Sequence, residues 1–203
     1  MAKIKITALA SGFGSTVEHV LDYEKREQPE WTIIGVVSEN PKARVLEVAK
    51  RFGIMSTLLP WRNYSNREAF DGAVLKAVEK QNPDVIFLLG YLKKISPALI
   101  KLYPKRIFNT HPSLLPKYGG KGMFGRAVHE SVIRSKGRES GVTIHEVSEN
   151  YDEGRILLQK KISVDSGWSV DDLEEKIKTL EKNTVVEFLN RLERGADDRA
   201  KMR

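Results

Sequence analysis

Residues 106–116 read RIFNTHPSLLP, and this stretch decides the fold because an apolar strand ends there in polar residues. Asn109 and His111 stand two positions apart, and in an extended backbone such residues point to the same face. Pro112 and Pro116 then restrict the exit of the chain, since each fixes φ and neither has a backbone N–H. The pattern predicts a strand end that presents an amide and an imidazole to one reactant. For N-x-H alone, an ordinary strand end with a hydrogen-bonded histidine is the alternative.

Upstream of this stretch, apolar runs alternate with segments of helical periodicity. The apolar runs occupy residues 4–10, 31–38, 55–59 and 84–89. Such strand–helix alternation predicts a parallel sheet with right-handed crossovers. Downstream, residues 140–147 and 156–164 form two consecutive strands, which predicts antiparallel pairing. The fold class expected is therefore α/β, a Rossmann-like open, mostly parallel twisted sheet flanked by helices, with antiparallel strands near the C-terminal end.

The domain organisation predicted from 203 residues is a single domain over residues 1–195. A charged helix over about 169–193 closes it, and the basic tail at 196–203 is expected to be frayed. The glycine-rich segment 117–125, KYGGKGMFG, is expected to be a loop that covers the substrate.

Composition excludes several kinds of site and compartment. The chain has no cysteine, which rules out disulfides, thiolate metal sites and a cysteine nucleophile. It has no apolar run near the ~20 residues of a membrane helix, and its first residues read as a strand rather than a leader. A cytoplasmic protein without a membrane partner is the expectation.

The net charge of +7 raises the question of nucleic-acid binding. The basic residues are dispersed, however, and their densest clusters lack the interleaved aromatic residues of a single-strand stacking surface. A modest positive field also suits small anionic substrates. We therefore expect small-molecule substrates and no nucleic acid.

A glycine loop follows the first apolar run, in the sequence Ser11-Gly-Phe-Gly-Ser15. A strand, a glycine loop and a helix in that order point free backbone N–H groups at a phosphate. The third glycine of a dinucleotide fingerprint is missing. Gly12 and Gly14 therefore indicate a single phosphate rather than a nicotinamide cofactor, with a plain tight turn as the alternative.

The polar residues at these strand ends suggest a reaction class. Ligands of open α/β sheets bind outside the carboxyl ends of the strands, where the loops carrying Gly12, Asn109, His111 and Asp152 would meet. The chain has no serine nucleophile elbow and no HExxH metal motif. The set fits acyl transfer to a substrate amine, in which Asn109 and His111 stabilise an oxyanion and Asp152 handles protons, with no metal.

The remaining histidines receive plainer interpretations. His19 and His129 lie on predicted helices and are expected at the surface or boundary. His145 lies in a predicted strand and is expected only to pack.

Two longer motifs carry a resemblance to a known family. NTHPSLLPKYGG begins at Asn109, and YDEGRILLQ begins at Tyr151. Together they resemble the folate-dependent formyltransferase family, and the likeness extends from SGFGS through the last helix. HPSLLPKY is the form typical of the members that formylate phosphoribosylglycinamide in purine biosynthesis. The resemblance implies transfer of the formyl group of 10-formyltetrahydrofolate, as co-substrate, to that amine.

The resemblance also assigns roles to individual residues. It implies that the catalytic residues are Asn109, His111 and Asp152. It implies that the phosphate and glycinamide of the acceptor meet Gly12, Gly14, Ser15, Thr16 and Glu181. It implies that the folate meets Arg67, Leu92, Lys93, Lys94, Ile95 and Asn109.

One departure from the family leaves the acceptor open. The family loop commonly has asparagine where this chain has Thr16. A formyltransferase for another amine, such as an amino-sugar nucleotide, is therefore an alternative, as is a non-catalytic or nucleic-acid-binding module with the same fold. A nicotinamide-dependent dehydrogenase is a more distant alternative. We expect either a monomer or a homodimer.

Overall fold

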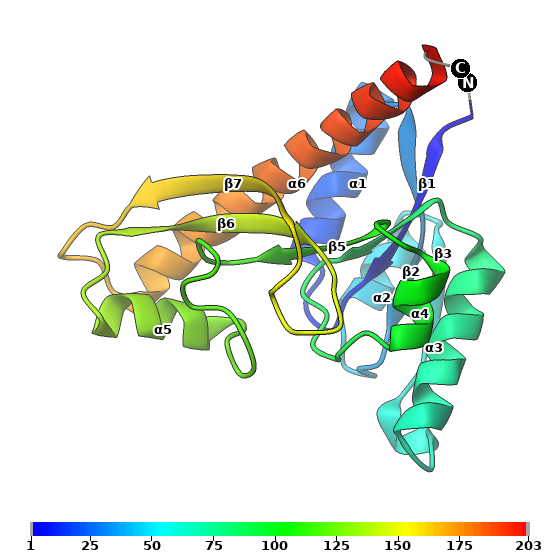
Figure 1. The fold of residues 1–203 in the computed structure, drawn as a ribbon, viewed down its shortest axis with the longest axis horizontal. Coiled ribbons are helices and arrows are strands. Elements are labelled where there is room, and N and C mark those ends of the chain that lie inside the picture. The colour runs from blue at the N-terminus through cyan, green and yellow to red at the C-terminus, as the bar shows by residue number, and fades with distance from the viewer. Residues whose placement is uncertain (1, 202–203) are drawn as a thin grey trace.

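A seven-stranded sheet in the order β3-β2-β1-β4-β5-β6-β7 forms the centre of the protein. The computed structural model describes residues 2–201, with side chains for residues 2–193. Figure 1 shows the open sheet with helices on both faces. The strands are β1 Ile4–Leu9, β2 Trp31–Ser38, β3 Met55–Leu58, β4 Val85–Leu88, β5 Ile107–His111, β6 Glu139–Glu146 and β7 Ile156–Ser163. The helices are α1 Ser15–Glu27, α2 Val45–Arg51, α3 Arg67–Gln81, α4 Pro97–Leu102, α5 Arg126–Arg134 and α6 Val170–Lys201, with a short 3₁₀ turn η1 at Trp61–Asn63.

The strand directions confirm the predicted fold class. Strands β1 to β5 are parallel, whereas β6 runs antiparallel to both β5 and β7. The chain builds outward from β1 through β2 to β3, then returns to add β4 on the other side of β1. This reversal of strand order opens a crevice at the carboxyl ends of β1 and β4, which is where ligands bind in open α/β sheets.

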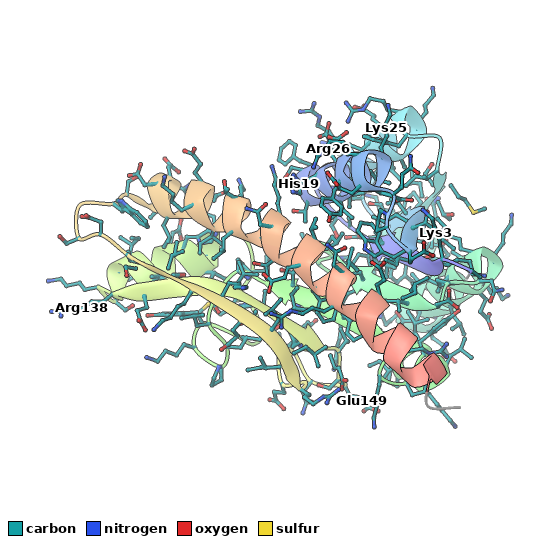
Figure 2. All side chains as sticks on the ribbon, turned by 90° about the horizontal axis from the view of Figure 1, so that it is seen from above. Lys3, His19, Lys25, Arg26, Arg138 and Glu149 are labelled. Carbon is teal, nitrogen blue, oxygen red and sulfur yellow. The ribbon has the colours of Figure 1, made fainter. Side chains whose placement is uncertain are left out.

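The central strands are apolar on both faces because helices cover both. In β4, Val85 and Phe87 pack into one hydrophobic cluster, while Ile86 and Leu88 pack into the other. The first cluster includes side chains of α1, α2 and α6, and the second includes side chains of α3 and α4. Figure 2 shows α6 running the length of one face, with α1, marked by His19 and Arg26, beside it.

Local sequence signals fix where the helices of the second layer begin. The Asn66 side chain accepts a hydrogen bond of 2.9 Å from the Ala69 N–H and so caps α3. The Ser96 hydroxyl caps α4 in the same way, accepting from the Leu99 N–H at 3.2 Å, and Pro97 occupies the first turn. Ser96 stands immediately after residues 91–95, which line the site.

The closing helix is longer than the sequence predicts. Helix α6 continues to Lys201, eight residues beyond the expected end at 193. The frayed tail expected over 196–203 is therefore helical as far as Lys201, and residues 202 and 203 lie outside the described residues. The sequence of this extension is mixed in helix propensity, because Ala, Arg and Lys favour a helix whereas Gly195 and the two Asp residues do not.

The register between β5 and β6 positions the polar residues of the sheet. Asn109 lies opposite His145, and His111 lies opposite Thr143. Thr110 stands between Asn109 and His111, so its side chain points to the opposite face of the strand, toward α6. One strand end therefore supplies groups to two sides of the same crevice.

No helix within residues 2–201 combines the length and the apolar character needed to cross a bilayer.

Candidate active site

A cavity of about 750 Å³ opens at the carboxyl ends of β1, β4 and β5. It is lined by the loops after these strands, by residues 120–125 and 145–152 in part, and by one face of α6. The sequence-predicted residues in its wall are Gly12, Gly14, Ser15, Thr16, Leu92, Lys93, Lys94, Ile95, Asn109, His111, Asp152 and Glu181. The structure thus brings together residues that lie as far apart in the chain as 12 and 181.

The glycine loop forms the start of α1 and leaves its backbone donors free. Gly14 has φ of 77°, a left-handed conformation that favours glycine, and it occupies the N-cap position of α1 without a side-chain cap. A Cβ at this position would lie 2.7 Å from Cβ of Val45, so the loop also depends on the small size of the residue. The first N–H groups of α1 have no intrahelical partner, which makes this turn suited to an anion.

Asn109 is oriented by His145 across the antiparallel pair. The His145 Nδ1 atom is 2.8 Å from the Glu146 carbonyl oxygen, which can only accept, so Nδ1 carries the hydrogen. In the neutral ring Nε2 is then an acceptor, and the Asn109 Nδ2 atom donates to it at 3.0 Å. This bond fixes which end of the Asn109 amide is nitrogen and leaves its second N–H hydrogen for the cavity.

His111 is 3% exposed and has an acceptor at each ring nitrogen. Its Nε2 donates to the Tyr118 carbonyl oxygen at 2.8 Å, and its Nδ1 lies 3.6 Å from the Asp152 Oδ2 atom. The contact with Tyr118 ties the imidazole to the segment 117–125, which supplies other lining residues.

Asp152 favours the charged form of His111, but burial has the larger effect on its protonation state. Burial lowers the pKa of His111 below its ordinary value and outweighs Asp152 and the Tyr118 carbonyl, which raise it. The nearby His145 adds to the lowering. In the substrate-free protein, therefore, the imidazole is neutral at neutral pH.

Asp152 holds the opposite end of this cluster as an anion. Burial would raise the pKa of its carboxyl, but the contacts with His145 and His111 and the Gly120 N–H together hold that pKa below its ordinary value. The Gly120 N–H donates to Oδ2 at 2.8 Å, and His145 Nε2 lies 3.6 Å from Oδ1. Asp152 therefore connects the two histidines and the 117–125 segment through one carboxylate.

One face of α6 forms the wall opposite this cluster. Glu174, Ile177, Lys178 and Glu181 line the cavity at the three- and four-residue spacing of one helical face. Lys178 Nζ pairs with Glu174 Oε1 at 2.5 Å. Burial raises the pKa of Glu181, although hydroxyl and lysine neighbours oppose the shift.

Residues 92–95, predicted to bind the folate, lie in the cavity wall. Arg67, also predicted to meet the folate, does not. Leu92 and Tyr151 are exposed apolar side chains on the rim, 53% and 43% exposed. Arg67 is not among the lining residues; its guanidinium bonds Asp71 at 2.7 Å and the Lys94 carbonyl oxygen. Arg67 thus contacts the backbone of segment 92–95 but does not line the cavity itself.

Two histidines were misjudged from sequence. His129 is 3% exposed and lines the cavity, so the surface or boundary position expected for it is wrong. Burial lowers its pKa, and its Nδ1 atom has no hydrogen-bond partner among the described residues. His145 does more than pack, because it orients Asn109. His19, by contrast, is partly exposed, as expected.

Among the lining residues that received no role in the sequence prediction are His129, His145, Glu174 and Lys178. Lys178 and Glu174 had a usable signal, since they stand three and seven residues before Glu181 on one helical face. His145 is found only by aligning β6 with β5. Among residues 2–201, no group of three or more His, Asp or Glu side chains is arranged to hold a metal ion.

Comparison with known proteins gives the same family that the two motifs resemble. The formyl transferase family model matches residues 4–189. Phosphoribosylglycinamide formyltransferase of Escherichia coli is 33% identical over 178 residues, covering 88% of this chain and 82% of that protein. The enzyme of the same name from Bacillus subtilis is 33% identical over 177 residues, covering 87% and 88%.

Solved structures agree with the sequence relatives. Glycinamide ribonucleotide transformylase 1 of Symbiobacterium toebii superposes with a TM-score of 0.88 at 29% identity, covering 96% of this chain and 89% of that one. Phosphoribosylglycinamide formyltransferase of Bacillus halodurans gives 0.85 at 30% identity, covering 93% and 94%. Because the family model matches residues 4–189 of the 203 residues, this chain belongs to the formyl transferase family.

Proposed function

We propose that this protein transfers the formyl group of 10-formyltetrahydrofolate to the amine of phosphoribosylglycinamide, as a single formyltransferase domain over residues 1–195. The observation that carries the proposal is the convergence of Asn109, His111 and Asp152 with a glycine loop in one cavity. The family match and the names of the relatives support both the reaction and the acceptor.

The cavity fits the two substrates in size and chemistry. A volume of about 750 Å³ lies in the range of small-molecule sites. The apolar rim with Leu92 and Tyr151 suits the ring system of a folate, and Lys93 suits its carboxylates. The glycine loop and Lys178 suit the phosphate of the acceptor, and Glu181 suits its glycinamide end.

The folate supplies the activated formyl group, and the residues of the chain orient and stabilise the transfer. The acceptor amine attacks the formyl carbon, the bond from that carbon to the folate nitrogen breaks, and one proton passes from the amine to that nitrogen. The free N–H of Asn109 can donate to the formyl oxygen as negative charge develops there, and His111, whose ring nitrogens meet the Tyr118 carbonyl and Asp152, stabilises that charge through its own positive charge when protonated. That charge favours the protonated form of His111, which Asp152 also favours.

Asp152 manages the proton. Because its pKa is held below the ordinary value, it is ionised at neutral pH and can orient a water that carries the proton between the two nitrogens. No metal and no covalent enzyme intermediate is required in this scheme. We further expect a cytoplasmic monomer or homodimer that binds neither nucleic acid nor membrane.

The test is a spectrophotometric assay of the wild-type chain with 10-formyltetrahydrofolate and phosphoribosylglycinamide. We expect turnover, and we expect His111→Ala and Asn109→Ala to reduce kcat by about 10²–10³ while the folate Kd changes little. Folate binding without transfer to this amine would overturn the acceptor. An amino-sugar nucleotide assayed in parallel would then show whether the chemistry serves another amine.

A further inference from the structure

Glu181 is held by two hydroxyl groups that come from different elements. Thr16, in the first turn of α1, lies with Oγ1 3.1 Å from Oε2 of Glu181. Thr110, in β5, lies with Oγ1 3.1 Å from Oε1 of the same side chain. Each carboxylate oxygen therefore has its own donor, and the carboxylate is fixed at two points.

This arrangement decides what the Thr16 side chain is free to do. A hydroxyl has one hydrogen to donate, and an ionised carboxylate can only accept. While Thr16 donates to Glu181, it has no hydrogen for a phosphate in the adjacent glycine loop. The phosphate must then be held by backbone N–H groups of the loop, by Ser15 and by Lys178.

The charged form of Glu181 needs these donors. Burial raises the pKa of Glu181, and the hydroxyls of Thr110 and Thr16 lower it, together with Lys178 and Lys182 on α6. His19 on α1, close enough to Lys182 to feel its charge, and His111 on β5 are the other titratable groups nearby on the packed elements. Both threonines line the cavity, but Thr110 is 5% exposed within the sheet, whereas Thr16 is more exposed, in the first turn of α1.

We propose that Thr16 is a positioning residue for the acceptor amine: it fixes the carboxylate of Glu181 where the amine binds, and it takes no part in binding the phosphate. The inference rests on the proposed function, since it assigns a role within that acceptor site. Thr110 lies between Asn109 and His111 on β5. Because side chains alternate along a strand, it points to the other face, where its hydroxyl bonds Glu181.

The test compares Thr16→Val, which keeps the shape and removes the hydroxyl, with Thr16→Ser, which keeps the hydroxyl. Thr179→Val on α6 is the matched control, because that exposed hydroxyl bonds only the Glu175 carbonyl of its own helix. We expect Thr16→Val to raise the KM for phosphoribosylglycinamide about tenfold and to leave the KM for the folate unchanged. Thr16→Ser should restore the acceptor KM to within about twofold.

Ribose 5-phosphate separates the amine role from a phosphate role, because it carries the phosphate and lacks the amine. We expect its inhibition constant to be the same in wild type and Thr16→Val, and an equal loss for inhibitor and substrate would overturn the proposal. The pH below which the acceptor KM rises should also move upward in Thr16→Val, because Glu181 loses a donor that lowers its pKa. An unchanged pH profile would likewise overturn it.

A double-mutant cycle guards against a purely structural effect. In a Glu181→Gln background, Thr16→Val should add little to the acceptor KM, since the two changes remove the same interaction. Full additivity would contradict the assigned role. Absence of wild-type turnover would instead count against the proposed function, so the two failures are distinguishable.

Discussion

The Asn109 amide nitrogen donates to Nε2 of His145 at 3.0 Å, across a directly opposed pair of antiparallel strands. This bond makes His145 responsible for the orientation of the amide that faces the reacting carbonyl. A flipped amide would present an oxygen to a developing negative charge, so the orientation matters for rate rather than for substrate binding.

We therefore predict that the chemistry at residue 145 controls kcat. His145→Leu, which removes the acceptor, should lower kcat by at least about tenfold and by at most the ~10²–10³ associated with one lost oxyanion donor. His145→Gln can place an oxygen near the position of Nε2 and should retain more of the rate. Steady-state kinetics of both variants, with the folate KM as internal reference, check the prediction. Equal kcat values for the two would contradict it.

The glycine loop offers a matched pair for stability. Gly14→Ala places a Cβ 2.7 Å from Val45 Cβ at a φ of 77° and should cost ~2 kcal/mol, or about 4–8 °C in Tm. Gly12→Ala meets no heavy atom within 4 Å and should leave Tm nearly unchanged. Thermal unfolding followed by circular dichroism tests this. Similar Tm values for Gly14→Ala and Gly12→Ala would contradict the prediction, because they would show that a Cβ at residue 14 does not strain the loop.

We predict that the positive charge of Lys178 in the cavity contributes to binding of the acceptor. Lys178→Met is expected to raise the acceptor KM by about tenfold or more, since a bond to an anionic group is lost. Lys176→Met is the matched control, because Lys176 is on the same helix but is not among the lining residues. The Lys178 effect should shrink at high ionic strength. Equal effects of the two changes would indicate a general field rather than a contact.

The buried histidines predict a pH dependence of folding. Burial lowers the pKa of both His111 and His129, so between the lowered values and about 6.5 the unfolded chain binds more protons than the folded one. The free energy of unfolding should therefore fall as pH drops below about 6.5, by at most about 1.4 kcal/mol per pH unit for each proton. Above that pH, their contribution is fully present.

Denaturant unfolding of wild type and His129→Gln at a series of pH values measures how much His129 contributes to the pH dependence of the free energy of unfolding. The variant is expected to be less stable at neutral pH and to show a shallower loss of stability between pH 7 and pH 5, since one group no longer titrates. Parallel curves for the two proteins would assign the acid sensitivity to other groups.

Local sequence patterns predicted the parts of the site that depend on a single strand end or turn. The strand end at Asn109 and His111 and the glycine loop at Gly12 and Gly14 are such parts, because alternation and backbone freedom are properties of a few adjacent residues. The parallel direction of the first strands was also predictable, because strand–helix alternation implies parallel strands joined by right-handed crossovers. These features placed the crevice correctly.

The features that sequence missed depend on distant packing. His145 acts through a cross-strand register that no local pattern reveals. The lowered pKa of His111 arises from its burial in the folded chain, which outweighs the opposite effect of Asp152. His129 shows how a polar residue on a short helix is buried when α5 packs against α6.

The pairing of Asn109 with His145 has a consequence for how this chain tolerates changes in length. Segment 112–138 joins the two strands as loop and helix, so residues gained or lost in its exposed turns need not alter which side chains oppose each other. A single residue inserted between Thr143 and His145 would instead turn the imidazole to the other face of the sheet. Insertions and deletions in variants of this chain should therefore be tolerated in segment 112–138 and not in β5 or β6. This holds even though segment 112–138 contributes more residues to the cavity wall than the two strands do.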